Sequence, residues 1–193
     1  MGPMGELAKL FPEMPPDAPT ELEIGFGKGL HLVNASVAYP GTRYLGVEIE
    51  RKYVFFAATT LTKKSIRNVR LVAGDAAVFI ASHVPEESLD VVHIYFPDPW
   101  WKKRHHKRRL VTQTFLEQVL RLLKVGGSIR FATDVEAYFQ MTEELLVNLK
   151  GVERTSPAAT SDPLHDMDYL THFERKARLK GKPIFRWVLK KMV

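Results

Sequence analysis

Two prolines flank a single acidic residue at the end of a strongly apolar stretch, in the order Pro97, Asp98, Pro99. Proline fixes its own φ, and it disfavours the helical conformation of the residue before it. The carboxylate of Asp98 is therefore held on a restricted backbone. A rigidly held carboxylate can orient a bound molecule by accepting hydrogen bonds, and it can stabilise a positive charge that develops during a reaction.

A glycine-rich turn follows Glu23 and contains Gly25, Gly27 and Gly29. Glycine lets the chain turn tightly and lets a ligand approach the backbone. A dinucleotide-binding turn requires a further glycine at the position of Leu30, and the G-x-x-x-x-G-K-[ST] phosphate loop does not occur. The turn therefore favours a ligand without a pyrophosphate, although a plain strand-to-helix turn is the structural alternative.

Two further acids follow apolar stretches. Glu48 comes after the stretch that begins at Arg43, and Asp75 comes after residues 69–73. A carboxylate at the first position can accept hydrogen bonds from both hydroxyls of an unphosphorylated ribose, and one at the second can reach an adenine edge. Each acid alone could be a helix cap or a surface acid. Together with the glycine turn, they favour a cofactor that contains a nucleoside.

The elements that must position these residues alternate between strands and helices. We expect strands at 21–26, 43–49, 69–73, 89–96, 128–132, 152–155 and 184–189. We expect helices at 30–39, 52–64, 115–123 and 135–149, a short helix that ends near Ser82, and a short basic helix before the final strand. Gly126 and Gly127 are expected to end the helix at 115–123.

Five strand–helix units predict an α/β fold, with a doubly wound and mostly parallel sheet. Ligands of such sheets bind at the carboxyl ends of the strands, near the switch in strand order. The length of 193 residues fits one domain. Residues 1–19 contain five of the twelve prolines, so we expect an irregular arm there and a single domain over residues 20–193.

The composition excludes several function classes. The chain has no cysteine, which rules out disulfides, thiolate zinc sites and a cysteine nucleophile. No apolar run approaches the roughly 20 residues of a membrane span, and the N-terminus does not resemble a secretory signal. We therefore expect a cytoplasmic protein without a membrane partner. His105 and His106 lack the spacing of metal ligands, so we expect no metal.

Positive charge is concentrated in two segments. The formal net charge is +6, six of the 28 lysines and arginines lie within residues 102–109, and eight more lie within 175–191. Such clustering is typical of a protein that binds a polyanion. A charge run can also be a solvated surface segment, but this one directly follows the end of a predicted strand.

The glycine turn, with acids after the second and third strands, resembles that of class I S-adenosylmethionine-dependent methyltransferases. The resemblance implies a seven-stranded, Rossmann-like sheet whose last strand is antiparallel, and S-adenosyl-L-methionine as the cofactor. It also implies that the cofactor is bound by nine residues: Glu23, Gly25, Gly27, Gly29, Glu48, Ile49, Asp75, Ala76 and Asp98.

The string from Pro97 to Arg109 is similar to the hallmark of the bacterial single-chain tRNA (guanine-N7)-methyltransferase family, and the similarity extends from Glu21 to Lys191. It implies methylation of N7 of a tRNA guanine in the variable loop, with the carboxylate of Asp98 as the catalytic group. The implied substrate-binding residues are Lys102, Asp134, Thr171, His172, Phe173 and Glu174. The charge of the basic run itself predicts contacts to tRNA phosphates by Lys103, Arg104, Lys107, Arg108 and Arg109.

Several alternatives stay open at this point. Thr133 and Thr171 each precede a glutamate by three residues, Glu136 and Glu174, so these residues could be helix caps. Trp100 and Trp101 could stack on a base or cover the sheet edge, and many relatives carry another residue at position 101. The chain could methylate another RNA position, or bind RNA without catalysis on the same scaffold. The sequence also does not decide whether the protein forms a homo-oligomer or requires a partner subunit.

Overall fold

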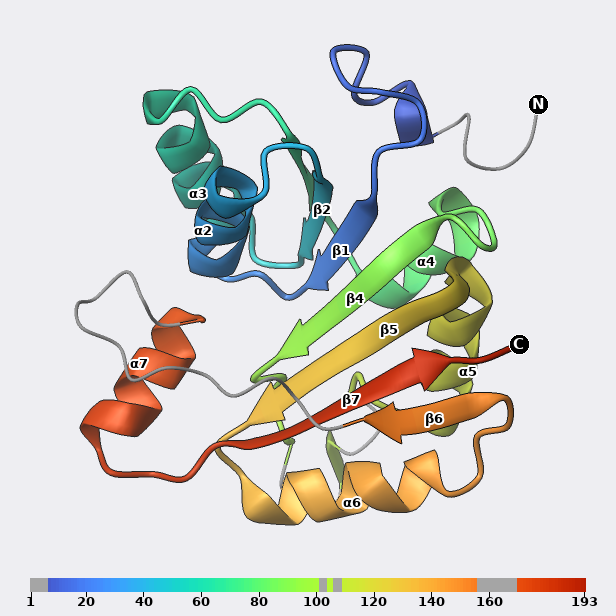
Figure 1. Cartoon of the computed structure of the whole chain (residues 1–193). Coiled ribbons are helices and arrows are strands. Elements are labelled where there is room, and N and C mark those ends of the chain that lie inside the picture. The colour runs from blue at the N-terminus through green and yellow to red at the C-terminus, as the bar shows by residue number, and fades with distance from the viewer. Residues whose placement is uncertain (1–6, 101–103, 106–108, 156–169) are drawn as a thin grey trace.

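The computed structural model describes residues 7–100, 104–105, 109–155 and 170–193, and its centre is a seven-stranded sheet (Figure 1). The strands are β1 Thr20–Ile24, β2 Arg43–Glu48, β3 Val69–Ala73, β4 Leu89–Tyr95, β5 Leu123–Thr133, β6 Val152–Thr155 and β7 Phe185–Lys191. The helices are α2 Leu30–Ala38, α3 Arg51–Lys63, α4 Ala76–His83, α5 Gln113–Leu122, α6 Glu136–Leu146 and α7 His172–Leu179.

The strand order is β3-β2-β1-β4-β5-β7-β6. Strands β1 to β5 pair in parallel, whereas β7 is antiparallel to both β5 and β6. The prediction of a mostly parallel, doubly wound sheet with an antiparallel last strand is therefore confirmed. The order of the strands reverses between β1 and β4, and ligands of such sheets bind outside the carboxyl ends of the strands at this point.

Two apolar clusters hold helices on the sheet. The larger cluster packs strand residues against α4, α5 and α6, and the smaller one packs β2 and β3 against α2 and α3. Trp187 of β7 is fully buried in the larger cluster, where it stacks on Phe131 at 4.9 Å between ring centroids. Its indole N–H donates to the hydroxyl of Thr142 in α6 (3.1 Å), so this buried polar group is satisfied.

Gly126 and Gly127 do not end a helix, so that prediction is wrong. Helix α5 ends at Leu122 and β5 begins at Leu123. Leu123 pairs with Leu89, but the next pair is Ser128 with Val91, so both glycines lie in a bulge of β5. Gly126 has φ +84°, and a Cβ on Gly127 would lie 2.9 Å from two carbonyl oxygens. The glycines therefore serve a strand irregularity, not a helix cap.

The described part of the N-terminal arm packs against the domain. Leu7 and Phe11 are buried in the larger apolar cluster. The guanidinium of Arg70, on β3, lies 4.7 Å from the ring centroid of Phe11 and also pairs with Glu13 at 3.0 Å. These contacts attach the arm to the edge strand β3.

Candidate active site

The glycine turn joins β1 to α2 in a conformation that favours glycine. Gly25, Gly27 and Gly29 have φ values of +71°, +53° and +74°. L-amino acids with a side chain rarely adopt this region of φ. A Cβ on Gly29 would also lie 2.9 Å from the Cβ of Ala57 in α3. The turn therefore requires glycine for its backbone shape and, at Gly29, for close packing of two helices.

The carboxylate of Glu48 is bound to the glycine turn. One of its oxygens accepts from the N–H of Gly27 and the other from the N–H of Glu50, both at 2.9 Å. Glu48 is buried at the end of β2. An ionised carboxylate has about four lone-pair positions, so two remain for hydroxyl donors of a ligand. Glu48 thus holds the turn in place, and its role in binding a ribose stays a prediction.

Asp75 follows β3 and caps α4. Its Oδ1 accepts from the N–H groups of Ala77 (2.8 Å) and Val78 (3.3 Å). The capping role that the sequence left open is therefore present, and the role of Asp75 and Ala76 in binding adenine stays a prediction. Ile49, after β2, is 67% exposed and could offer an apolar surface to the same ligand.

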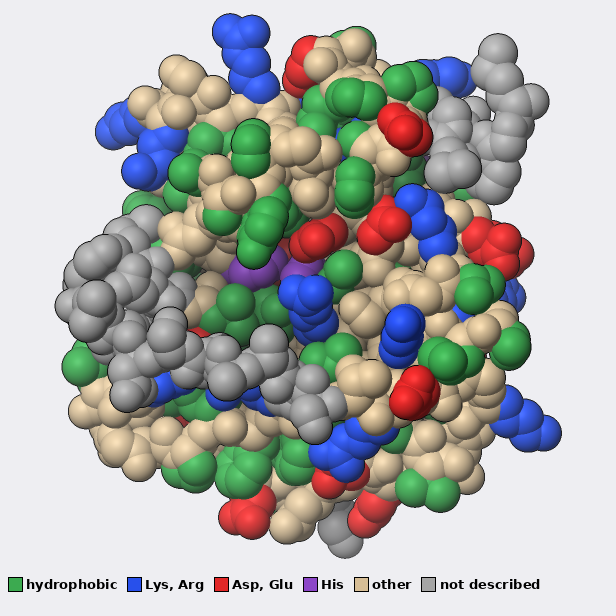
Figure 2. Space-filling view, in the orientation of Figure 1, with side chains coloured by type: hydrophobic (Ala, Val, Ile, Leu, Met, Phe, Trp, Pro, Cys, Tyr) green, Lys and Arg blue, Asp and Glu red, His purple; other side chains and the backbone are tan. Residues whose placement is uncertain are grey.

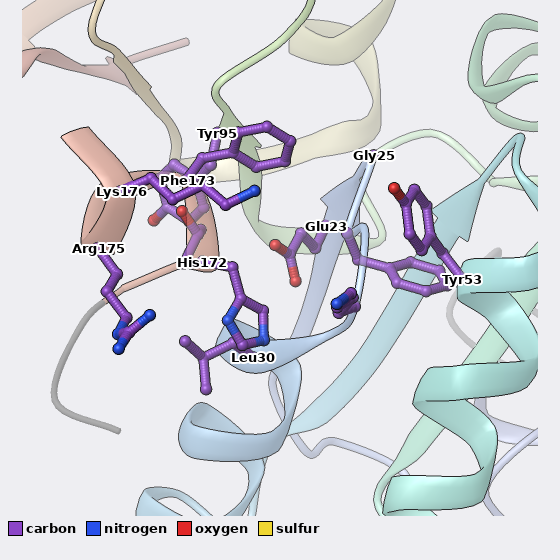
Figure 3. A pocket seen from close by; sticks show the side chains of 12 residues that line it. Glu23, Gly25, Leu30, Tyr53, Tyr95, His172, Phe173, Arg175 and Lys176 are labelled. Carbon is purple, nitrogen blue, oxygen red and sulfur yellow. The ribbon is translucent and has the colours of Figure 1, made fainter. Parts of the chain in front are cut away.

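A cavity of about 210 Å³ lies between the glycine turn and α7. Its lining residues are Glu23, Gly25, Phe26, Lys28, Leu30, Tyr53, Tyr95, Thr171, His172, Phe173, Arg175 and Lys176. Figure 3 shows Tyr53 on one side of Glu23 and the side chains of α7 on the other. The cavity therefore brings Glu23, which is predicted to bind the cofactor, and three residues predicted to bind substrate to one place.

Four other predicted acids lie outside the lining of this cavity: Glu48, Asp75, Asp98 and Asp134. They follow the neighbouring strands β2, β3, β4 and β5, respectively. The cavity thus occupies only one part of the carboxyl edge of the sheet. A ligand that touched all five acids would extend well beyond the cavity along that edge.

Buried polar side chains lie beneath Glu23, on the face of the sheet covered by α2. His31 Nδ1 lies 3.3 Å from Glu23, and its ring is 4.4 Å from the ring of His93 between centroids. His93 Nε2 lies 2.7 Å from Glu21, and His93 Nδ1 lies 2.7 Å from the hydroxyl of Tyr95. These contacts connect an acid of the cavity to a chain of hydrogen bonds in the interior.

The protonation states of the side chains in this hydrogen-bonded network follow from their burial. Burial lowers the pKa of His93 to about 4, in spite of the hydrogen bond to Glu21, so the imidazole is neutral at pH 7. Burial tends to raise the pKa of Glu21, but the hydrogen bond from His93 and nearby positive charges lower it overall. His93 therefore donates from Nε2 to ionised Glu21 and accepts at Nδ1 from Tyr95, whose pKa burial raises.

We expect the buried, neutral His93 to lower the free energy of unfolding in acid. Because the pKa of His93 is about 4 in the folded protein and 6.5 in the unfolded chain, the unfolded chain takes up its proton first as the pH falls. Between pH 7 and pH 4 we expect His93 to account for a loss of about 3 kcal/mol in the free energy of unfolding. Urea denaturation of His93→Gln should show a smaller loss, because the glutamine amide can make both hydrogen bonds but does not titrate.

If His93→Gln lost stability with falling pH as steeply as the wild type, the assignment of a neutral buried His93 would be wrong.

The turn that carries Asp98 is constrained at both ends. Phe96 and Trp100 have φ values of +52° and +44°, which are uncommon for bulky residues. The N–H of Phe96 donates to the carbonyl oxygen of Ala132 (2.7 Å), and its ring stacks on Phe173 of α7 at 6.3 Å. Asp98 itself is exposed. Strained backbone of this kind is concentrated at functional sites, which supports a functional role for this acid.

Only part of the basic run can be placed. Lys102, Lys103, Lys107 and Arg108 lie outside the described residues, as does Trp101. Arg104 is exposed and donates to His105 (3.2 Å), whose ring meets Trp100 edge to face at 5.6 Å. Arg109 donates to the carbonyl oxygen of Pro99 (2.9 Å), so it stabilises the turn that carries Asp98.

The start of α7 shows which of the predicted caps form. The hydroxyl of Thr171 accepts from the N–H of Glu174 (3.0 Å), and Glu174 accepts from the N–H of Leu170 (3.1 Å). The side chain of Glu174 is only 3% exposed and also binds Arg178 (2.9 Å) and Arg186 (2.6 Å). Glu174 therefore positions α7, and its direct contact with substrate stays a prediction. His172 and Phe173 do line the cavity.

The other predicted cap does not form as a capping box. The hydroxyl of Thr133 accepts from the N–H of Val135 (3.2 Å), one residue before Glu136. Asp134, at the end of β5, pairs with Lys182 at 2.9 Å. This ion pair connects the end of β5 to the segment that follows α7, close to the helix that lines the cavity.

The sequence did not predict seven residues that line the cavity: Phe26, Lys28, Leu30, Tyr53, Tyr95, Arg175 and Lys176. Only the fold brings Tyr53 of α3 and Tyr95 of β4 to the same cavity. A signal did exist for the buried network, because His93 lies between apolar residues of β4, next to β1, which carries Glu21 and Glu23.

Among the described residues, no helix is long and apolar enough to cross a membrane. No group of three or more His, Cys, Asp or Glu side chains in the same part of the chain could hold a metal ion.

The strand order, the glycine turn and the acids at the strand ends define the fold of class I methyltransferases. The solved structure of precorrin-6y C5,15-methyltransferase from Geobacter metallireducens matches this chain with a TM-score of 0.61 at 20% identity. The match covers 91% of this chain and 82% of that chain.

Sequence comparison identifies the family. Residues 17–187 match the model of a family described as "Putative methyltransferase". The chain is 43% identical to the tRNA (guanine-N(7)-)-methyltransferase of Rhodopirellula baltica, over 88% of this chain and 65% of that protein. It is 37% identical to the protein of the same name from Serratia proteamaculans, over 88% of this chain and 71% of that protein. The chain therefore belongs to the tRNA (guanine-N7)-methyltransferase family, and it spans about two thirds of the length of these relatives.

Proposed function

We propose that this protein transfers the methyl group of S-adenosyl-L-methionine to N7 of a guanine in tRNA, the reaction for which its curated relatives are named. One observation carries the proposal. Glu23, Glu48, Asp75 and Asp98 lie at the carboxyl ends of β1, β2, β3 and β4, and these four strands are adjacent in the order β3-β2-β1-β4. The four acids therefore lie along one continuous edge, beside the glycine turn.

The chemistry of these residues fits the cofactor from one end to the other. Glu23 in the cavity would bind the ammonium group of the methionine part, and Glu48 would accept from the ribose hydroxyls. Asp75, Ala76 and the exposed Ile49 would contact the adenine. Bound S-adenosylmethionine supplies an electrophilic methyl group on a positively charged sulfur, and acids along this edge complement that charge.

The reaction requires orientation more than proton transfer. Guanine N7 carries a lone pair and no proton at neutral pH, so no base has to create the nucleophile. Alignment of two bound reactants can contribute roughly 7–11 kcal/mol. The methylated purine is cationic, and the exposed, rigidly held carboxylate of Asp98 would stabilise that charge as it develops. The same carboxylate can accept from N1–H and the amino group of guanine, which would select guanine over adenine.

In this reaction tRNA would lie across the cavity and the basic run. Lys102, Asp134 and residues 171–174 would contact the guanosine and its neighbours, and Lys103, Arg104, Lys107 and Arg108 would contact phosphates. Arg109 already binds the carbonyl of Pro99, so we assign it to holding the turn of Asp98 as well. We include the variable-loop guanosine as the target and a cytoplasmic location in this proposal.

Removal of charge from the basic run should weaken tRNA binding in a salt-dependent way. In the variant Lys103→Gln, Lys107→Gln, Arg108→Gln, we expect the slope of log K against log salt to fall in magnitude by roughly 2–3, because each lost phosphate contact removes about 0.7–0.9. Arg109 is retained so that the Asp98 turn stays intact. A matched variant at Arg121, Lys150 and Lys190, three exposed cations near the β6–β7 end of the sheet, should keep the wild-type slope. An unchanged slope in the first variant would show that the run is only solvated surface.

The function itself is tested by incubation of the protein with methyl-labelled S-adenosylmethionine and unmodified tRNA, followed by digestion and identification of the labelled nucleoside. We expect 7-methylguanosine. A different methylated nucleoside would establish a methyltransferase that acts on another RNA position. A protein that bound tRNA but not the cofactor would be a non-catalytic RNA-binding protein on the same scaffold.

A further inference from the structure

A third basic segment lies outside the two that the sequence pattern indicates. Residues 51–70 contain six lysines and arginines and no aspartate or glutamate. Their charge of +6 equals the formal net charge of the whole chain. Helix α3 makes up most of this segment, and Figure 2 shows blue side chains gathered at the upper left, over α3. Arg51, Lys52 and Lys63 lie on α3 and Lys64 directly follows it, so four of the six charges belong to this helix and its end.

The same helix exposes two phenylalanines. Its buried side consists of Ala57 and Leu61, which pack on the sheet, whereas Phe55 is 72% exposed and Phe56 is 49% exposed. On a helix, Arg51 and Thr59 lie one turn before and one turn after Phe55. The surface of α3 therefore carries aromatic rings between cations and hydroxyl groups. Phe55 and Phe56 are neighbours, and contiguous exposed apolar side chains can form a binding surface.

Cations accompany the aromatic rings at close range. The Nζ of Lys28 lies 5.3 Å from the ring centroid of Phe56, and the Nζ of Lys52 lies 5.1 Å from that of Tyr53. Lys52 also has a weak, exposed pairing with Glu50 at 3.5 Å. Arg51, Lys63 and Lys64 are exposed and make no ion pair with any other described residue. Their charges are thus available to a partner.

This face is continuous with the cavity. Lys28 and Tyr53 line the cavity from the side of α3, and Arg175 and Lys176 line it from the side of α7. Figure 3 shows Tyr53 on one side of Glu23, and Arg175 and Lys176 on the other. A long ligand that placed one of its units in the cavity would therefore have cations on both sides of the entrance.

We propose that this α3 face is a second contact surface for tRNA, on the opposite side of the cavity from α7. The face consists of Arg51, Lys52, Phe55, Phe56, Lys63 and Lys64. The cations would neutralise phosphates, and the two rings would stack on unpaired bases. The inference rests on the proposed function, since it takes tRNA as the polyanion that enters the cavity.

Charge favours RNA over a second copy of this chain as the occupant. A two-fold symmetric contact places the same patch of both copies against itself. Here that contact would oppose cations to cations, because the segment contains no acid. A polyanion with unpaired bases complements both the charge and the exposed rings.

The charge of the face is tested with the variant Arg51→Gln, Lys63→Gln, Lys64→Gln. Glutamine keeps the helix propensity and removes the charge. We expect the slope of log K against log salt for unmodified tRNA to fall in magnitude by roughly 2–3. Binding of S-adenosylmethionine should match the wild type, which shows that the variant is folded. The variant Arg121→Gln, Lys150→Gln, Lys190→Gln, at the far end of the sheet, should keep the wild-type slope. A wild-type slope in the α3 variant would overturn the proposal.

The rings are tested separately with Phe55→Ala, which removes an exposed side chain and should leave the fold intact. We expect tRNA affinity to fall by at least about fivefold, with no change in the slope against salt. Sedimentation of both proteins is measured in parallel. If Phe55→Ala converted a dimer to a monomer and left tRNA affinity unchanged, the face would be an interface between copies and the proposal would be wrong. If the wild type still formed 7-methylguanosine in that case, the proposed function would stand without this inference.

Discussion

Asp98→Asn is expected to lower the rate of methyl transfer to tRNA by roughly 100-fold or more, without unfolding the protein. Asparagine keeps the size of the side chain and the backbone between Pro97 and Pro99, but it removes the negative charge that would stabilise the cationic product. It also replaces one acceptor oxygen with an NH₂ donor, which would face the N1–H and amino donors of guanine. Single-turnover rates at saturating tRNA and cofactor would measure the effect on the chemical step.

The control for this variant is Glu86→Gln, which removes one negative charge from an exposed side chain remote from the strand ends. It should methylate at the wild-type rate. Near-normal turnover of Asp98→Asn would contradict the role of Asp98 in orientation and charge stabilisation, whatever the rate of the control.

Glu48→Gln should raise the Kd for S-adenosylmethionine by roughly 100-fold. In the structure both carboxylate oxygens of Glu48 accept backbone N–H groups, from Gly27 and Glu50. A glutamine side chain has only one acceptor oxygen, so its NH₂ group would face one of these N–H donors. The cost of a buried unsatisfied donor is about 1–3 kcal/mol, and the loss of a charged acceptor for the ribose adds to it. Isothermal titration of the cofactor would measure the change.

The neighbouring acid provides a control for this measurement. The side chain of Glu50 is 57% exposed, and its contact with Lys52 is long, so Glu50→Gln should leave the Kd within about twofold of the wild type. A Kd for Glu48→Gln equal to that of the control would show that the cofactor does not use the end of β2.

Much of the fold could be predicted from local patterns. The strands at 69–73 and 152–155 agree with the structure to the residue, and the other elements agree within a few residues at most ends. These elements have clear apolar periodicity and clear turn residues, which determine local structure. The β5 bulge could not be predicted in this way, because a glycine pair after a helix fits a helix end as well as a strand irregularity. Only the pairing of β5 with β4 distinguishes the two.

The site was predictable where backbone chemistry constrains the residue type. Glycines at positive φ and an acid between two prolines leave a signal in the sequence, and the structure adds positive φ at Phe96 and Trp100. The partners of the buried polar groups could not be predicted in this way, because they depend on which elements become neighbours. Glu174 matches a capping box, but its binding to Arg186 depends on how α7 packs beside β7. The hydrogen bonds that join Glu21, His93 and Tyr95 likewise form only when β1 and β4 are neighbours in the sheet.

Transfer to N7 of a tRNA guanine is the central claim, and a pair of transcripts tests it most directly. One tRNA carries guanosine at the proposed variable-loop position, and the other carries 7-deazaguanosine there, in which a C–H group replaces N7. Both are incubated with the protein and methyl-labelled S-adenosylmethionine. We predict labelled 7-methylguanosine in the first tRNA and no label at that position in the second. Equal labelling of both transcripts would contradict the claim, because the methyl group would then have been placed on another atom.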